Sequence, residues 1–536
     1  MIVRAALALT AALVATPASN APVPADAALA KAMAVSACGS GEGAGRAGVK
    51  PAVLVAGLTP AHMPVSANRE AQAFFDQGLG QLFGFDYDEA LKSFARAAVI
   101  DPACAMCGWG TALALGPYIN SGPIDAATVA RAQGYTGRAL RSGALSERDR
   151  ALVDAVHMRH APGGKQSGVH GDRYADTMLR LAARWPADDL VAILAAEAVM
   201  DAQPWDYWAA GGRVNKGRAG EAIRLVETVL ARSPDDPQAI HLLIHLTEAS
   251  ADPGRAAGPA ARLGRLSPAA PHMVHMPSHT WYRIGRFEEA IDANRAAIAA
   301  DDAYARAVGD DPKFYGYFIH HNHFLASAAT QTGDRVTALA AAGAIEAAIL
   351  PEAAVKRPYL QARLATALHA RARFLTPAEV LALPAPDPRL LRLMVAWHGV
   401  RAEAKAQTGD IAGAEAELLA LRAARDAIKA GPEATRTSVS DLALAAIADG
   451  VARGRIAEAR GEPAEALRHY RAAEAVEANF PYFEPPLWPT PVAVLAGAVR
   501  LKSGDRSGAA ADFRRALVQR PGNSLAGAGL TAAMAA

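Results

Sequence analysis

The sequence predicts an all-α fold, a solenoid built from helix-turn-helix repeats. Histidines recur in step along the chain, since His241 and His275 are 34 residues apart and His245 and His279 are also 34 residues apart. A period of 34 residues is the length of one two-helix repeat unit. The composition agrees, because 51% of the 536 residues are hydrophobic but only 6% are aromatic. Such a composition suits closely packed helices better than a β core of large side chains.

The first segment, residues 1–21, has the features of a cleavable signal peptide. Arg4 precedes an apolar run from Ala5 to Val14, and small residues follow around Ala18 and Ala21. This run is too short to cross a bilayer, and no later segment has enough uninterrupted apolar residues to do so. We therefore expect export to a periplasmic or secreted location, and no membrane span after signal cleavage.

Residues 22–66 are rich in Ala, Gly and Pro without sustained periodicity, which predicts a flexible leader. Helical periodicity begins near Asn68, so we assign residues 67–350 to an N-terminal array. The Pro-rich stretch that contains Pro377 and Pro384 interrupts the pattern, and residues 351–390 are expected to be a helical segment with a junction. Residues 391–536 then form a C-terminal array, which gives two helical arrays in all.

One stretch near the start of the N-terminal array carries a recognisable repeat signature. Its positions are Phe74, Gly78, Ala90, Phe94, Ala97 and Pro102. This order of aromatic, small and proline residues resembles the tetratricopeptide repeat (TPR), in which small residues let two helices approach and proline ends the second. The same register returns at Ala222, Ala256 and Ala290, again in steps of 34. The resemblance implies a TPR-like, right-handed superhelix.

The histidine-rich region is the strongest functional lead. When the chain is aligned with the TPR signature, these histidines occupy repeat positions that resemble the groove-lining positions of TPR proteins. The predicted ligand-binding groove consists of His241, His245, Glu248, His272, His275, His279, His320 and His323. The helical spacing agrees, because residues three or four apart lie on one face of a helix. The first hypothesis is that this groove binds a peptide, a protein partner or another ligand.

The second hypothesis uses the same region as a metal site. Two histidines four residues apart on a helix can offer two nitrogens to one ion, and neighbouring helices can add more. The candidate metal ligands are His241, His245, His275, His279, His323 and Glu484, and zinc, copper or iron suits them. Glu248 is a candidate oxygen ligand or general base. Ring nitrogens within roughly 4–5 Å of one another would favour a metal, and a fan of separated imidazoles would favour the binding groove. Rings that each bond to a backbone carbonyl would instead indicate structural core histidines.

Cys104 and Cys107 form a C-x-x-C pair after Pro102, and Cys38 lies alone near the start of the chain. In an oxidising compartment the pair is most simply a disulfide. A redox role stays open, because a helix start lowers the pKa of the first thiol. Gly108 stands where covalent haem attachment would need a histidine.

Several sequence blocks resemble a family of exported bacterial TPR proteins of largely unassigned function. The blocks begin at Asp101, Pro204, His241, His272, His320, Tyr482 and Pro521. The resemblance covers most of residues 60–530 and implies the fold and the export route rather than a reaction. One departure lies at Asp86-Tyr87, where relatives tend toward an Asn-His pair.

The charge pattern and the missing motifs narrow the function classes. The formal net charge is +2, with 55 basic and 53 acidic residues. The sequence has no block of Lys and Arg that would contact a phosphate backbone, so we expect no nucleic-acid partner. The sequence lacks a P-loop, a dinucleotide-binding glycine motif, a nucleophile elbow and an HExxH zinc motif. Whether the protein is an enzyme is left undecided.

Overall fold

A computed structural model of the chain describes residues 52–142, 145–314, 317–431 and 438–535. The predicted signal peptide, most of the predicted leader and Cys38 lie outside these residues. The all-α, TPR-like solenoid is confirmed: the described residues form helices, with two isolated β-bridges and no strand. No helix in this part of the chain is long and apolar enough to cross a membrane.

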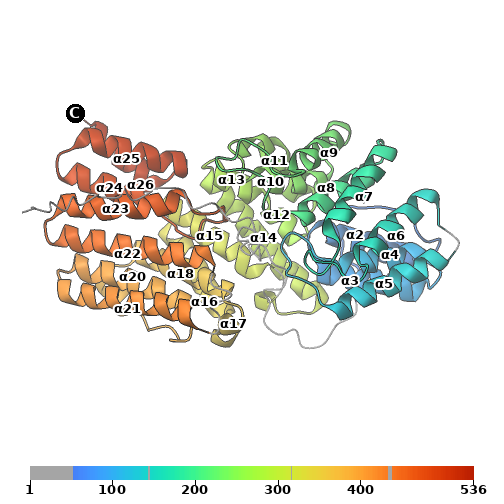
Figure 1. Cartoon of the computed structure of the whole chain (residues 1–536), viewed down its shortest axis with the longest axis horizontal. Coiled ribbons are helices and arrows are strands. Elements are labelled where there is room, and N and C mark those ends of the chain that lie inside the picture. The colour runs from blue at the N-terminus through green and yellow to red at the C-terminus, as the bar shows by residue number, and fades with distance from the viewer. Residues whose placement is uncertain (1–51, 143–144, 315–316, 432–437, 536) are drawn as a thin grey trace, which may run out of the picture.

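The N-terminal helices lie at one end of the molecule (Figure 1). They are α2 (Arg69–Phe83), α3 (Tyr87–Ile100), α4 (Ala105–Ala114), α5 (Ala126–Arg141), α6 (Glu147–Arg159), α7 (Gly171–Arg184) and α8 (Asp189–Ala202). Helix α2 begins where the sequence predicts, because the Asn68 side chain accepts hydrogen bonds from the first-turn amides of Glu70 and Ala71. Phe94 of α3 packs between the glycines of two neighbouring helices, Gly78 and Gly110.

The middle of the chain carries the histidine repeats. Its helices are α9 (Ala219–Arg232), α10 (Pro237–Thr247), η1 (Pro253–Ala256), α11 (Ala257–Leu266), α12 (Pro271–His275), α13 (Pro277–Arg283), α14 (Phe287–Val308), η2 (Pro312–Phe314), α15 (Phe318–Thr332) and α16 (Arg335–Ala348). Helices α10 and α12 begin 34 residues apart at prolines, the residue favoured in a first helical turn. The next repeat is longer because α14 runs for 22 residues before Gly309 ends it with φ 74°.

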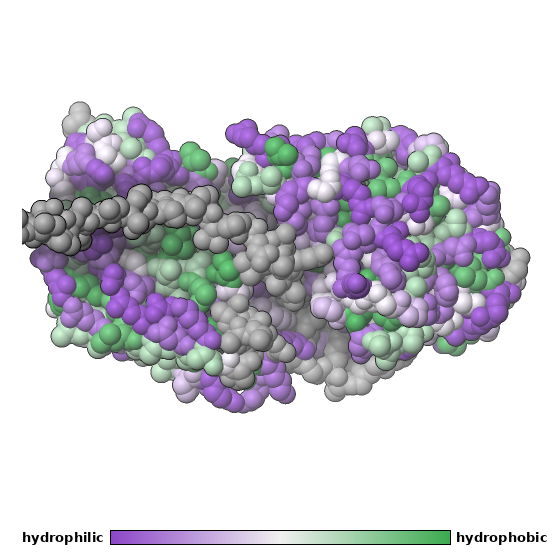
Figure 2. All heavy atoms as spheres, in the orientation of Figure 1, coloured by the Kyte–Doolittle hydropathy of each residue, from purple (hydrophilic) through white to green (hydrophobic). Residues whose placement is uncertain are grey.

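The C-terminal helices complete the solenoid. They are α17 (Pro351–Lys356), α18 (Tyr359–Phe374), α19 (Pro377–Leu381), α20 (Leu391–Gln407), α21 (Ile411–Ala430), α22 (Val439–Ala459), α23 (Pro463–Ala478), α24 (Val492–Lys502), α25 (Arg506–Gln519) and α26 (Ser524–Met534). One hydrophobic cluster runs from Trp281 through Leu360 and Val380 to Trp397. The core therefore continues through residues 351–390. In Figure 2, hydrophobic residues also show in a recess of the C-terminal half.

Segments from both ends of the described chain return to the middle. The Tyr317 hydroxyl donates a hydrogen bond to the carbonyl oxygen of Phe85 at 3.1 Å, which joins α15 to the α2–α3 turn. The Tyr482 hydroxyl donates to the Glu248 carboxylate at 2.9 Å, which joins the α23–α24 segment to α10. These contacts bring both segments against the histidine repeats.

Candidate metal centre

Four helices of the middle repeats place eight histidines side by side. They are His241 and His245 on α10, His272 and His275 on α12, His279 on α13, and His320, His321 and His323 on α15. Each is only 0–2% exposed. The predicted groove residues, with Glu248 at 1% exposure, form a buried cluster.

The first group consists of His241, His245 and His272, whose ligand atoms lie within 4.8 Å of one another. The Nε2 atoms of His241 and His272 are 3.2 Å apart. The Nε2 atom of His245 is buried and has no hydrogen-bond partner among the described residues. Two ligands of one ion at about 2.0–2.1 Å are themselves separated by roughly 3 Å, so this spacing suits a shared ion.

The second group consists of His275, His279 and His320, again within 4.8 Å. The Nε2 atom of His275 lies 2.9 Å from Nε2 of His279 and 3.0 Å from Nε2 of His320. Three imidazole nitrogens from three helices therefore converge on one point.

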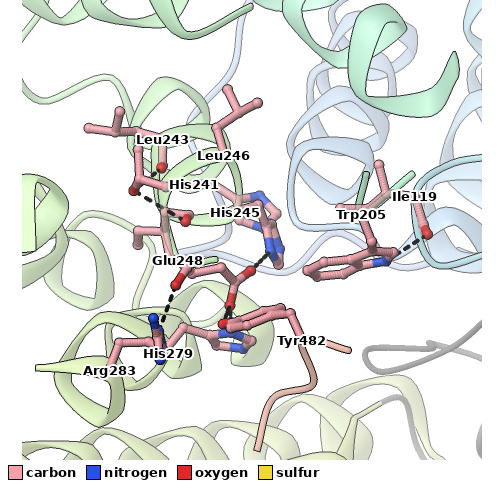
Figure 3. A network of polar contacts seen from close by, with 12 residues as sticks. Ile119, Trp205, His241, Leu243, His245, Leu246, Glu248, His279, Arg283 and Tyr482 are labelled. Carbon is pink, nitrogen blue, oxygen red and sulfur yellow. Dashed lines mark hydrogen bonds and ion pairs between the residues drawn. The ribbon is translucent and has the colours of Figure 1, made fainter. Parts of the chain in front are cut away.

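Glu248 connects the two groups, as Figure 3 shows. Its carboxylate accepts hydrogen bonds from Nδ1 of His245 at 2.7 Å and from Nδ1 of His279 at 2.6 Å. Burial alone would raise the pKa of Glu248, but the two histidines hold this pKa well below its usual range. The carboxylate is thus ionised, and it orients one imidazole of each group as a carboxylate does behind a metal-binding histidine.

Hydrogen bonds at Nδ1 fix which nitrogen of each ring carries a proton. Nδ1 of His241 faces the carbonyl oxygen of Phe83 at 2.8 Å, and a carbonyl only accepts. Nδ1 of His275 faces Oδ1 of Asn294 at 2.8 Å, and this orientation is set because Asn294 Nδ2 donates to Ala290. With the two rings held by Glu248, four imidazoles carry the proton on Nδ1. Their Nε2 atoms point into the cluster, where a neutral ring offers a lone pair.

The surroundings also disfavour a charged imidazolium. Burial, followed by neighbouring histidines, lowers the pKa of His241, His272 and His275 well below the ordinary value. Burial lowers the pKa of His245 as well, against the opposing effect of Glu248. The cluster therefore consists mainly of neutral nitrogen donors, the form that binds metals.

Two strained aromatic residues cover the first group. Phe85 and Trp205 have φ angles of 55° and 62°, in a region that bulky side chains rarely adopt. The Phe85 ring lies 4.4 Å from the His241 ring and stacks on His245 at 5.5 Å, while Trp205 meets His245 edge-on at 5.3 Å. Strain of about 1–3 kcal/mol at such a position is typical of functional sites.

Two predicted metal ligands lie outside the histidine groups. Nε2 of His323 contacts the Thr366 hydroxyl at 2.9 Å rather than another imidazole, because α18 packs against that face of α15. Glu484 is 3% exposed, and neither of its carboxylate oxygens has a hydrogen-bond partner among the described residues. Burial raises its pKa to about 7, although Arg283 opposes this. It lies near His279 and Glu248 without joining a three-residue group.

Sequence reasoning assigned two members of the groups, His272 and His320, to the groove but not to the metal. It did not single out His321, whose Nδ1 faces Asp301 at 2.6 Å and whose ring lies 4.7 Å from that of His275. The sequence feature that could have pointed to His321 is the adjacent pair His320-His321. Neighbouring helical residues normally point apart, but the crowded face of α15 buries both.

Two other sequence predictions concern α3 and α4. Cys104 and Cys107 form a disulfide with a Cα–Cα distance of 5.4 Å. The pair is buried at the start of α4, which agrees with a structural role. At the position where the family resemblance predicts histidine, the Tyr87 hydroxyl donates to Glu197 at 2.7 Å. Tyr87 therefore contributes no ligand to the cluster.

No protein-family model and no curated protein matches the chain. Among solved structures, it is similar to yeast Tom70, with 9% identity over 87% of this chain and 88% of that chain, and a TM-score of 0.27. It is similar to the TPR domain of P58(IPK), with 11% identity, coverage of 86% and 97%, and a TM-score of 0.19. It is also similar to human IFIT1 with m7Gppp-AAAA, with 13% identity, coverage of 84% and 91%, and a TM-score of 0.31. Similarity this low says nothing about function.

Proposed function

We propose that this chain is a transition-metal-binding protein whose centre is the buried histidine cluster. Two ions would bind, one to His241, His245 and His272, and one to His275, His279 and His320. Glu248 would orient one ring of each group by accepting a hydrogen bond from its Nδ1. Imidazole donors of this kind suit zinc, copper or iron.

One observation supports this proposal above the others. The Nε2 atoms of His275 and His279 lie 2.9 Å apart, while Asn294 and Glu248 accept hydrogen bonds from Nδ1 of both rings. Nε2 of His320 lies 3.0 Å from Nε2 of His275. A shared proton bridges only two of these nitrogens, whereas a metal ion would engage all three.

The alternative, a peptide or protein bound in a histidine-lined groove, needs the imidazoles to be accessible. Their burial favours the metal for these particular residues. A partner that binds elsewhere on the solenoid is compatible with the metal centre. We also propose that the protein acts outside the cytoplasm, on the strength of the signal-like residues 1–21 and the Cys104–Cys107 disulfide.

Elemental analysis of the full chain, purified from its native compartment, tests the metal proposal. The expected result is two transition-metal ions per chain. A matched pair of variants on α15 locates the second ion: His320→Gln should reduce the content to one, whereas His323→Gln should keep two. A wild-type chain that contains no metal and takes none up at stoichiometric level would contradict the proposal.

A further inference from the structure

The two three-histidine groups offer donor atoms of a single kind. Each supplies three imidazole nitrogens. Glu248 forms a third group with His245 and His279, but its oxygens already accept hydrogen bonds from Nδ1 of both rings. A structural zinc ion takes four protein ligands, and a catalytic zinc ion takes three ligands plus a water. A divalent ion in either group would therefore need at least one ligand besides the imidazoles.

The cluster leaves little room for such additional ligands. Its histidines are 0–2% exposed. A cavity of about 20 Å³ borders the cluster at His272 and is lined also by Tyr317 and Asp86. This volume holds about one water molecule. It borders the first group, so a fourth ligand for an ion at His275, His279 and His320 would have to come from elsewhere.

The charged groups around the histidines also limit the charge that can be buried there. Five charged side chains interact electrostatically with the histidines or with Glu248 among the described residues. They are the carboxylates of Glu248, Glu484 and Asp301 and the guanidinium groups of Arg283 and Arg363. With all five groups ionised, their formal balance is one negative charge, and it is less negative where burial keeps Glu484 or Asp301 protonated. Two divalent ions would add four positive charges to this interior, and two monovalent ions would add two. Uncompensated buried charge is strongly unfavourable.

We infer that the two groups are built to hold a pair of monovalent copper ions, Cu(I), each bound by three imidazole nitrogens. This inference rests on the proposed function and specifies its metal. Copper accepts imidazole ligands, and as a closed-shell monovalent ion it is satisfied by two or three donors. It therefore needs neither the extra water nor the extra negative charge that a divalent ion would require.

A competition between two metals tests this inference on the wild-type full chain, so that no variant has to fold. The chain is stripped with a chelator under reducing, oxygen-free conditions and titrated with Cu(I) against a coloured Cu(I) chelator. We expect two Cu(I) ions per chain, retained when Zn(II) is added at equal total concentration. X-ray absorption should show a first shell of about three nitrogen neighbours and no sulfur.

The opposite outcomes separate the two proposals. If the chain binds two Zn(II) ions and keeps them against equal Cu(I), or binds only one Cu(I), the copper pair is wrong and the metal centre stands. If neither metal binds, both proposals fail. His320→Gln should bind one Cu(I) and His323→Gln two; a His323→Gln chain that loses an ion would overturn the assignment of ligands.

Discussion

Each imidazole with an assigned tautomer has one nitrogen held by the fold and the other turned toward its neighbours. Four different acceptor atoms serve this purpose: the Phe83 carbonyl oxygen, the Asn294 amide oxygen and the two oxygens of the Glu248 carboxylate. A structural histidine needs only one good partner. Fixing the proton on the same nitrogen in four adjacent rings is instead what a set of metal ligands requires.

Glu248→Gln tests this orientation directly. The amide oxygen can accept from one Nδ1, but the amide nitrogen would then face the other Nδ1–H as a second donor. One histidine must change its tautomer and lose its Nε2 lone pair. We expect metal affinity to fall about 10–100-fold, measured by chelator competition. Glu477→Gln, at a buried carboxylate that accepts from the Val492 amide, is the control and should leave affinity unchanged.

At the scale of helices, small residues decide how closely neighbours approach. A Cβ atom added to Gly110 would lie 2.6 Å from the Phe94 ring, and one added to Gly78 would lie 2.8 Å from it. Gly78 and Phe94 belong to the TPR-like signature, which explains why periodicity and spacing predicted the helices of this region well.

Gly110→Ala should therefore destabilise the chain by about 1–3 kcal/mol, since the Phe94 ring has no free space to move into. Gly134→Ala is the matched control, because a Cβ there meets only the end of the Arg138 side chain, at 3.8 Å. In a helix interior it should stabilise by about 0.5–1 kcal/mol. Thermal unfolding of both variants measures the difference, and equal midpoints would contradict the packing argument.

The candidate site was predictable only in part, because some of its contacts join residues that lie far apart along the sequence. The His275–His279 pair follows from spacing within one stretch of chain. The partner of His323 does not, because Thr366 comes from α18 in a region where the repeat pattern is interrupted. The cover supplied by Phe85 and Tyr482 joins residues more than 200 positions apart along the sequence, and no local pattern contains it.

At the scale of the whole molecule, the cluster ties distant helices together. Residues from α2–α3, α10, α12, α13, α15 and the α23–α24 segment all contact it. An ion that binds the folded chain and not the unfolded one adds stability in proportion to the logarithm of its concentration.

Metal removal should consequently lower the thermal midpoint of the entire chain. At 1,000 times its dissociation constant, each ion adds about 4 kcal/mol to the folded state. Calorimetry with and without chelator measures the shift. His323→Gln should keep the full shift and His320→Gln about half of it; a chelator that leaves the wild-type midpoint unchanged would show that the cluster is stable without metal.

Acid should destabilise the metal-free chain. Burial lowers the pKa of His160 and of His369 to about 4, and lowers the pKa of His323 well below the ordinary value of 6.5. These rings stay neutral when folded but gain a proton below pH 6.5 when unfolded, so stability falls as the pH drops through this range. From pH 6.5 to 5, a histidine with a pKa near 4 contributes about 2 kcal/mol to the loss.

Buried carboxyl groups act in the opposite direction. The pKa of Asp201 is raised to about 8, those of Glu197 and Glu484 to about 7 and that of Glu477 to about 6, so the folded chain binds their protons more tightly than the unfolded chain does. The buried histidines with lowered pKa outnumber the carboxyls raised this far, because the cluster adds its own rings to the set. The thermal midpoint at pH 5 should therefore lie below that at pH 7.5. His369→Gln, which removes one such ring at a distance from the cluster, should show a smaller fall, and an equal fall in both chains would place the acid sensitivity elsewhere.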